Sequence, residues 1–298
     1  MLNLNEFWRH EYDNDSYMSH LSTKHLSDRA KYLIENVTTL EENGKIGIKS
    51  VQVDPGRKLM RLFTHVLQEL NNRSESFANN FISDAAIPKP MIENSQRMIE
   101  IGAQYKEQKP QLIKFGKKKW INSLKISLAK SFDDPSLNVA QIDDEMKAIF
   151  QPHPSEIKIT DMSGKDISGV KSIELSFEID RDYYIYCSSH SFDYRLFGDF
   201  DADCCLFIFD SHRFSTDIMN ELGKQVDLED HGFKPVKYLD PIKPEINGRP
   251  EIEFHKQLKY SYQNEFRHVF IPKDNQPLYK DIFVAIPQLY EYSELVNL

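Results

Sequence analysis

The spacing of apolar residues changes near residue 105, and this change constrains the fold more than any other feature of the chain. Before it, apolar residues recur at intervals of three and four, the period of a helix with one buried face. One such helix is predicted to end at Asn71-Asn72, after Leu59, Leu62, Phe63, Val66, Leu67 and Leu70. Asp54 is placed to cap its start, with Pro55 at its first position. A second helix is expected from His25 to Leu40.

After residue 105 the pattern becomes that of strands and loops. Apolar and polar residues alternate over 173–179, which predicts a strand with one buried face, and 183–188 is expected to pair with it across a turn. The apolar run 204–209 predicts a central strand buried on both faces. Three more predicted strands complete a sheet of about six: 236–238, 266–271 and 282–286. Phe214, Ile218, Met219 and Leu222 predict a helix that ends at Gly223.

These patterns predict an α+β chain with a helical N-terminal region, residues 1–105, followed by a mixed-sheet domain, residues 106–298. Hydrophobic residues make up 40% of the 298 residues, which suffices for a packed core. No apolar run approaches the ~20 residues of a membrane span, and the N-terminus lacks the features of a signal peptide. The three cysteines match neither a disulfide framework nor a zinc site. A cytoplasmic protein without membrane association is expected.

A basic strip interrupts an otherwise acidic chain. The net charge of -9 argues against non-specific nucleic-acid binding by the whole surface. Between 104 and 130, however, Glu107 is the one acid among eight lysines: Lys106, Lys109, Lys114, Lys117, Lys118, Lys119, Lys125 and Lys130. With Trp120 beside them, Lys117, Lys118 and Lys119 form a candidate nucleic-acid-binding surface. The alternative, which the spacing favours, is a solvated helix face whose lysines pair with the acids that follow.

Gln263 and Glu265 stand where a short helix is expected to run into the strand 266–271. Because side chains alternate along a strand, both are expected on the same side of the sheet. A carboxylate near the hydroxyls of the segment 187–191 could contact a ribose and stabilise an oxocarbenium ion. The alternative is that Glu265 pairs on the surface with Arg267 or Lys256.

Two further segments are weaker candidates. A strand ending at Lys114 or Gly116 is expected to lead into a helix whose N-terminus favours anions, with lysines positioned to hold a pyrophosphate. The acidic run from Asp133 to Glu145 could bind Mg²⁺, as in a nuclease, although helix capping is the favoured interpretation. The ten histidines show no spacing that singles out a catalytic pair.

Four segments in order resemble a group of uncharacterised bacterial proteins, and that group is similar to divergent ADP-ribosyltransferases, including the toxin branch that modifies nucleic acids. The segments are Leu112–Gly116, Ser131–Asn138, Tyr184–Ser189 and Phe254–Arg267. The resemblance covers roughly residues 110 to 290 and leaves out the first hundred residues. It implies that the second half of the chain is an ADP-ribosyltransferase-like domain.

In that superfamily an Arg or His, a Ser or Tyr, and a Glu from three strands form the site. The resemblance assigns these roles to Lys114, Ser188 and Glu265. It also implies that Gln263 orients the acceptor and that Ser189 and Tyr184 help to bind NAD, with no metal. Lys114 departs from the family pattern, because a lysine lacks the two-pronged grip of a guanidinium. Arg57 or Arg61 could supply that grip only if the helical region folded over the site.

The resemblance therefore implies an NAD-dependent ADP-ribosyltransferase that acts as a toxin or effector in bacterial defence. The lysine strip suggests RNA or DNA as the acceptor. A neutralising antitoxin would be expected to dock on the helical N-terminal region. Two alternatives stay open: a metal-dependent nuclease that uses the 133–145 carboxylates, and a non-catalytic module that binds nucleic acid or protein.

Overall fold

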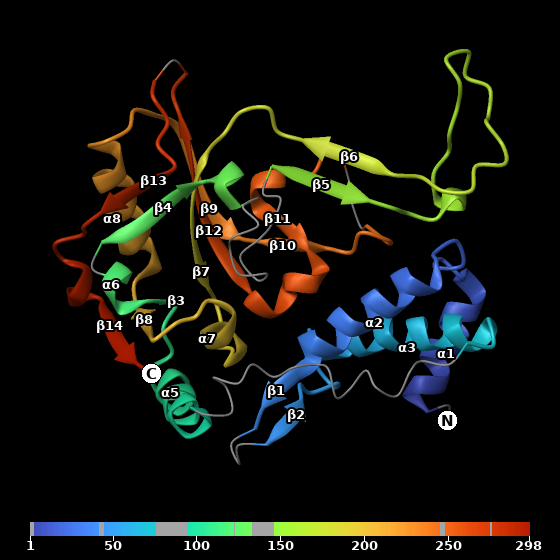
Figure 1. Cartoon of the computed structure of the whole chain (residues 1–298), viewed down its shortest axis with the longest axis horizontal. Coiled ribbons are helices and arrows are strands. Elements are labelled where there is room, and N and C mark those ends of the chain that lie inside the picture. Colours follow the sequence, from blue (N-terminus) through green and yellow to red (C-terminus); the bar gives the residue numbers. More distant parts are fainter. Residues whose placement is uncertain are drawn as a thin grey trace.

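The computed structural model describes residues 3–41, 45–75, 94–121, 123–132, 146–244, 248–274 and 276–298, and its fold is α+β. The helices are α1 (Leu4–Asp15), α2 (Thr23–Val37), α3 (Gly56–Asn72), α5 (Ser95–Gln108), α6 (Lys118–Ile121), α7 (Arg195–Asp199) and α8 (Ser211–Gly223). Short 3-10 helices are η2 (Ala129–Phe132), η3 (Pro154–Glu156), η4 (Ile252–Phe254), η5 (Leu258–Gln263) and η6 (Leu289–Glu291). Figure 1 shows α1, α2 and α3 grouped beside a larger sheet.

The strands fall into one large sheet and three two-stranded ones. The large sheet contains β3 (Leu112–Gly116), β4 (Leu124–Leu128), β7 (Tyr184–Ser189), β8 (Cys204–Ile208), β9 (Leu228–Pro235), β12 (Glu265–Pro272), β13 (Asp281–Val284) and β14 (Ser293–Asn297). The small sheets pair β1 (Thr38–Leu40) with β2 (Ile46–Ile48), β5 (Lys147–Phe150) with β6 (Leu175–Glu178), and β10 (Lys237–Leu239) with β11 (His255–Gln257).

The three N-terminal helices share a core with part of the sheet domain, in which Leu26, Leu33, Leu59 and Val66 are buried together with Ile242 and Leu258. Helix α2 confirms the helix expected from His25 to Leu40, although it ends at Val37. Helix α3 ends at Asn72 as predicted. The predicted cap at the start of α3 is wrong. The helix begins at Gly56, the N-cap position is Pro55, and no side chain caps it.

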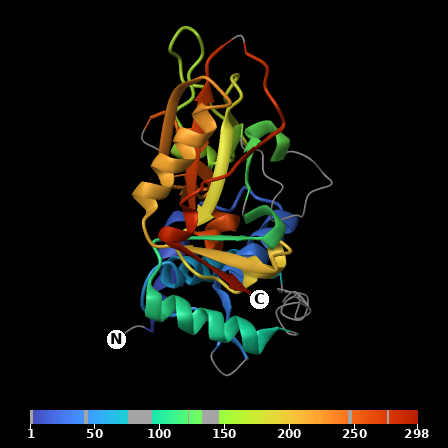
Figure 2. The same cartoon turned by 90° about the vertical axis from the view of Figure 1, so that its left-hand side faces the viewer.

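Strand β8 confirms the prediction of a central strand, because β3 and β14 pair with its two edges and all five residues are buried. Its alternate side chains face different helices. Leu206 and Ile208 pack in one cluster with residues of α8, whereas Cys205 and Phe207 pack in another with residues of α5 and α7. Figure 2 shows α8, in orange, alongside the sheet and α5, in teal, across its lower end.

Strand β7 branches the large sheet. Along one edge it pairs with β12 from Tyr184 to Ser189. Along the other edge two different strands share it: β4 pairs with Tyr184 and Ile185, and β3 pairs with Ser189. Residues 186–188 lie between these two pairings, so β3 and β4 diverge beside them. The sheet is therefore split along the middle of β7.

Several strand pairings differ from prediction. Residues of the expected strand 173–179 form β6, but it pairs with β5 and not with 183–188, which form the central strand β7. The expected strand 236–238 becomes β10, in a small sheet outside the large one. The helix expected after Gly116 is only the four-residue α6, followed by β4, so it offers no long helix N-terminus to an anion.

The helical region and the sheet domain meet at a buried ion pair. Arg29 of α2 donates to both carboxylate oxygens of Asp240, at 2.8 and 2.5 Å, and both side chains are buried. Helix α5 runs across the expected boundary at residue 105, and its Met98 and Ile101 pack with the sheet.

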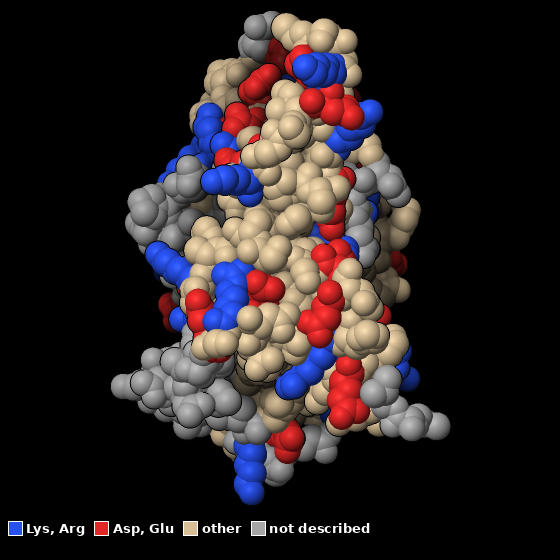
Figure 3. Space-filling view, turned by 90° about the vertical axis from the view of Figure 1, so that its right-hand side faces the viewer, with Lys and Arg blue, Asp and Glu red and all other residues tan. Residues whose placement is uncertain are grey.

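No helix within the described ranges combines the length and apolar composition that crossing a membrane requires. Figure 3 shows that basic and acidic side chains are interspersed on one face.

We expect His268→Phe to reduce the acid sensitivity of the fold. Burial lowers the pKa of His268 to about 3, so the folded state keeps this ring neutral while an unfolded chain protonates it near pH 6.5. This contribution to stability is present above about pH 6.5 and is lost as the pH falls, by up to about 1.4 kcal/mol per pH unit. The ring lies among Tyr186, Phe214 and Phe266, and its Nε2 lies 2.8 Å from the Ser215 hydroxyl, a hydrogen bond that the variant loses at every pH.

Urea unfolding of the wild type and His268→Phe at pH 8, 6 and 4.5 measures this effect. The difference in unfolding free energy should shift in favour of the variant as the pH falls. Parallel curves over the whole range would contradict a neutral buried histidine.

Candidate functional site

A cavity of about 410 Å³ opens where β3 and β4 diverge along β7. Its walls include Lys114 of β3, residues 185–189 of β7, Gln263 at the end of η5 and Glu265 at the start of β12. Apolar side chains such as Leu124 and Phe132 line the rest. This size lies within the range of about 300–1,000 Å³ that is usual for small-molecule sites. The split in the sheet therefore brings together most of the residues that the sequence singles out.

Glu265 is the first residue of β12 and is 5% exposed. Its Oε1 accepts a 2.5 Å hydrogen bond from Nε of Arg267, and its Oε2 accepts a 3.1 Å bond from Nζ of Lys256. Burial alone would raise the pKa of Glu265, but the adjacent guanidinium and ammonium groups hold it well below its usual range. Glu265 is therefore a fixed carboxylate, suited to stabilising positive charge and unsuited to donating a proton. The pairing expected from sequence is present with both partners, but it is buried.

Gln263 ends η5, two residues before Glu265, so a short helix does run into the strand as predicted. It is 3% exposed, and its Nε2 donates to the Tyr262 hydroxyl at 3.4 Å. Asn264 between them adopts a left-handed backbone conformation (φ 40°), which turns the chain from the helix into the strand. Both Gln263 and Glu265 line the cavity.

The serines of β7 occupy different faces of the sheet. The register pairs Ser189 with Glu265, so these two side chains share a face and Ser188 belongs to the other. Ser189 donates to the carbonyl of Gln263 at 2.6 Å, and Ser188 donates to the carbonyl of Phe266 at 3.3 Å. Both serines line the cavity. Tyr184 does not: it is fully buried in the core, and its hydroxyl accepts from the backbone N–H of Tyr279.

Lys114 reaches across the split from β3 to β7. Its Nζ donates to the carbonyl of Cys187 at 2.7 Å and lies 4.7 Å from the centre of the Tyr186 ring. Burial lowers the pKa of Lys114, because a charged ammonium is poorly solvated there. The lysine thus takes part in closing the open edge of β7 and places a cation on the cavity wall.

Three cations lie at the cavity wall or just behind it: Lys256 and Arg267 are buried, and Lys114 is half-buried. Among the contacts that the structure describes, Lys256 and Arg267 bond to Glu265, whereas Lys114 donates to a carbonyl. Such a site favours an anionic ligand. From the sequence, Lys256 and Arg267 were expected only as surface partners of Glu265. They lie nine residues before it and two residues after it.

The lysines after Gly116 lie at the rim. Lys117 pairs with Asp201 at 2.8 Å, and Nζ of Lys119 lies 4.7 Å from the Trp120 ring. Trp120 is 46% exposed, lines the cavity and contacts the ring of Phe283. Lys118 is exposed, and its backbone N–H donates to Asp203. An ion partner that the structure describes for this strip is Asp201, and the acids that follow, residues 133–145, lie outside the described residues, so the expected pairing with them stays a prediction.

Other sequence candidates fall outside the cavity. Arg61 pairs with Glu11 at 3.2 Å within the helical region, and neither Arg57 nor Arg61 lines the cavity. The acidic run 133–145 lies outside the described residues. In the parts of the chain that the structure describes, no three His, Cys, Asp or Glu side chains gather as a metal site would require. No family model, curated protein or solved structure matches the chain.

We expect Lys256→Met to be less harmful in a Glu265→Gln background than in the wild type. Glu265→Gln alone leaves two buried cations without their carboxylate, which should cost about 3–5 kcal/mol of stability. Removing the Lys256 charge as well relieves part of that cost, so the two changes should be strongly non-additive. Urea unfolding of the four proteins in the cycle measures the coupling. Additive losses would mean that the three groups are not one charged unit.

Proposed function

We propose that the cavity binds NAD and that the protein transfers ADP-ribose to a macromolecule. The observation that carries this proposal is the fixed carboxylate of Glu265, held beside Gln263 and Ser189 at the wall of a ligand-sized cavity. The resemblance to ADP-ribosyltransferases points to the same residue. An enzyme that cleaves the bond between nicotinamide and ribose is helped by such a carboxylate, because positive charge develops on the ribose.

The cationic side chains at the cavity support a dinucleotide as the ligand. Lys114 and Lys256 line the cavity and offer ammonium groups to an anion, and Arg267 lies just behind Glu265. A pyrophosphate carries the complementary charge. The apolar part of the wall, which includes Leu124 and Phe132, offers contacts to a flat ring. Together these features fit a ligand with a charged middle and aromatic ends.

In the proposed reaction, the bond between C1′ of the ribose and the nicotinamide nitrogen breaks, and nicotinamide leaves with the bonding electrons. The ring nitrogen thereby loses its positive charge while C1′ becomes cationic, and Glu265 stabilises that cation. A nucleophile of the acceptor then bonds to C1′ and releases a proton. Gln263, on the same wall, is placed to orient the acceptor.

The rim supports a nucleic-acid acceptor. Trp120 is half-exposed at the cavity, with Lys119 against its ring and Lys117 nearby. Aromatic and basic side chains together suit bases and phosphates. The proposal includes a cytoplasmic role as a toxin or effector in bacterial defence, with an antitoxin bound at the helical region; this part rests on the resemblance alone.

One observation favours a second candidate, a binding module without catalysis. Both oxygens of Glu265 are occupied by cations, and Lys114 stands where the family has Arg or His. A site of this kind could hold an anionic ligand and leave it unchanged. In that case Glu265 matters to folding, and the lysines at the rim matter to binding.

We expect purified protein to release nicotinamide from NAD, and the rate to rise with RNA, DNA or cell lysate as acceptor. Glu265→Gln should lower the rate about 100-fold or more, since it removes the charge that stabilises the cation. EDTA should not change the rate; loss of nucleic-acid cleavage in EDTA would instead indicate a metal-dependent nuclease. Liquid chromatography of nicotinamide is the measurement.

Asp240→Asn is the matched control. It also removes a carboxylate from a buried arginine pair, but this pair joins the helical region to the sheet domain and does not line the cavity. At a temperature where both variants stay folded, Asp240→Asn should keep most of the rate. Equal rates for the wild type and Glu265→Gln would refute the proposal, and NAD binding without release would support the binding module.

A further inference from the structure

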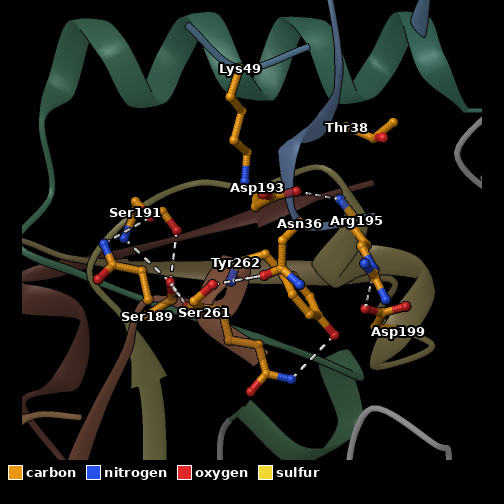
Figure 4. Close-up of polar contacts among 12 residues, drawn as sticks. Asn36, Thr38, Lys49, Ser189, Ser191, Asp193, Arg195, Asp199, Ser261 and Tyr262 are labelled. Atoms are coloured by element: carbon orange, nitrogen blue, oxygen red, sulfur yellow. Dashed lines mark hydrogen bonds and ion pairs between the residues drawn. The ribbon is translucent and has the colours of Figure 1, made fainter. Parts of the chain in front are cut away.

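Asn36, a residue of α2 in the helical region, forms hydrogen bonds with η5, the segment that carries Gln263. Its Nδ2 donates to the carbonyl of Lys259 at 2.7 Å. Its Oδ1 accepts from the Ser261 hydroxyl and from the backbone N–H of Tyr262, each at 2.9 Å. Figure 4 shows Asn36 beside Ser261 and Tyr262. One side chain therefore satisfies three groups of η5 across more than 220 positions of sequence.

The geometry of these bonds leaves η5 little freedom. Asn36 is 1% exposed and Tyr262 is buried, so the backbone N–H of Tyr262 would lack a substitute from bulk water if the Asn36 side chain were removed. A second bond from Nδ2, to the carbonyl of Tyr32 at 2.7 Å, holds the amide against its own helix. The rigid α2 thus sets the position of residues 259–262 in the sheet domain.

Tyr262 is also held from the opposite side. The Arg195 guanidinium lies 4.0 Å from the centre of its ring, and Arg195 pairs with Asp199 at 2.9 Å, as seen in Figure 4. The Tyr262 hydroxyl accepts from Gln263. Helix α2 therefore fixes the backbone of Tyr262 while α7 fixes its ring, and Gln263 follows directly.

We propose that Asn36 is a positioning residue for the cavity wall formed by Gln263 and Glu265. Glu265 is only three positions after Tyr262, so a displacement of η5 moves both cavity side chains. The helical region then also positions part of the site. The effect on activity rests on the proposed function, whereas the effect on η5 does not.

The test compares Asn36→Ala with Thr38→Ala. Thr38 also bonds from the end of α2, with its hydroxyl on the carbonyl of Ile34, but it makes no bond to η5 that the structure describes. Hydrogen exchange of the Tyr262 amide reports directly on the bond to Asn36. The exchange rate of this amide should rise at least tenfold in Asn36→Ala and should stay unchanged in Thr38→Ala. The turnover number for nicotinamide release should fall about tenfold or more in Asn36→Ala and not in Thr38→Ala.

Asn36→Asp keeps the inference testable if the alanine variant does not fold. A carboxylate can still accept from Ser261 and Tyr262 but has no proton to donate to Lys259. Protonation restores a donor, so protection and nicotinamide release in this variant should recover, relative to the wild type, as the pH is lowered. Unchanged exchange at Tyr262 in both Asn36 variants would overturn the inference. A wild type that releases no nicotinamide would refute the proposed function, while the exchange result would still decide the role of Asn36.

Discussion

The branching of β7 is the constraint on which the rest of the structure depends. A strand has two edges, and here one edge is filled by β12 while the other is divided between β3 and β4. Three residues in the middle of the divided edge are left facing a cavity instead of a strand. Backbone groups away from water need partners, and Lys114 supplies one at Cys187. The cavity is thus a product of sheet topology, and Lys114 helps to stabilise the divided edge of β7.

The charges around Glu265 show why this wall can be rigid. Removing a carboxylate and two cations from water is costly, and their mutual attraction offsets that cost only with good geometry. The observed bonds provide it, with one cation on each carboxylate oxygen. Such an arrangement contributes little to net stability compared with apolar packing, but it holds a charged group in one place. A fixed charge costs no reorganisation when a ligand changes its own charge, which is the property that catalysis of ionic reactions requires.

The sequence predicts what local patterns determine and misses what distant pairing determines. The apolar run of β8 and the stripe of α8 each contain their own signal, and both elements are present. Strand β4 was hidden because its residues follow the lysine run and read as a continuation of a basic helix. The strand at 183–188 pairs with β12, about 80 positions further along the chain, and not with the nearby strand 173–179 that the sequence predicted. Glu265, Gln263 and Ser189 were recoverable from motif and spacing, whereas no pattern near Asn36 indicates what it bonds to.

The three cysteines have a practical consequence. Cys204 and Cys205 are buried in β8, whereas Cys187 is partly exposed and lines the same cavity as Glu265. A reagent that modifies accessible thiols in the native protein would therefore react at one place, beside the carboxylate. The chain carries its own attachment point for a fluorescent or cross-linking group. Whatever fills the cavity can be detected by the shielding of that sulfur, before its chemistry is known.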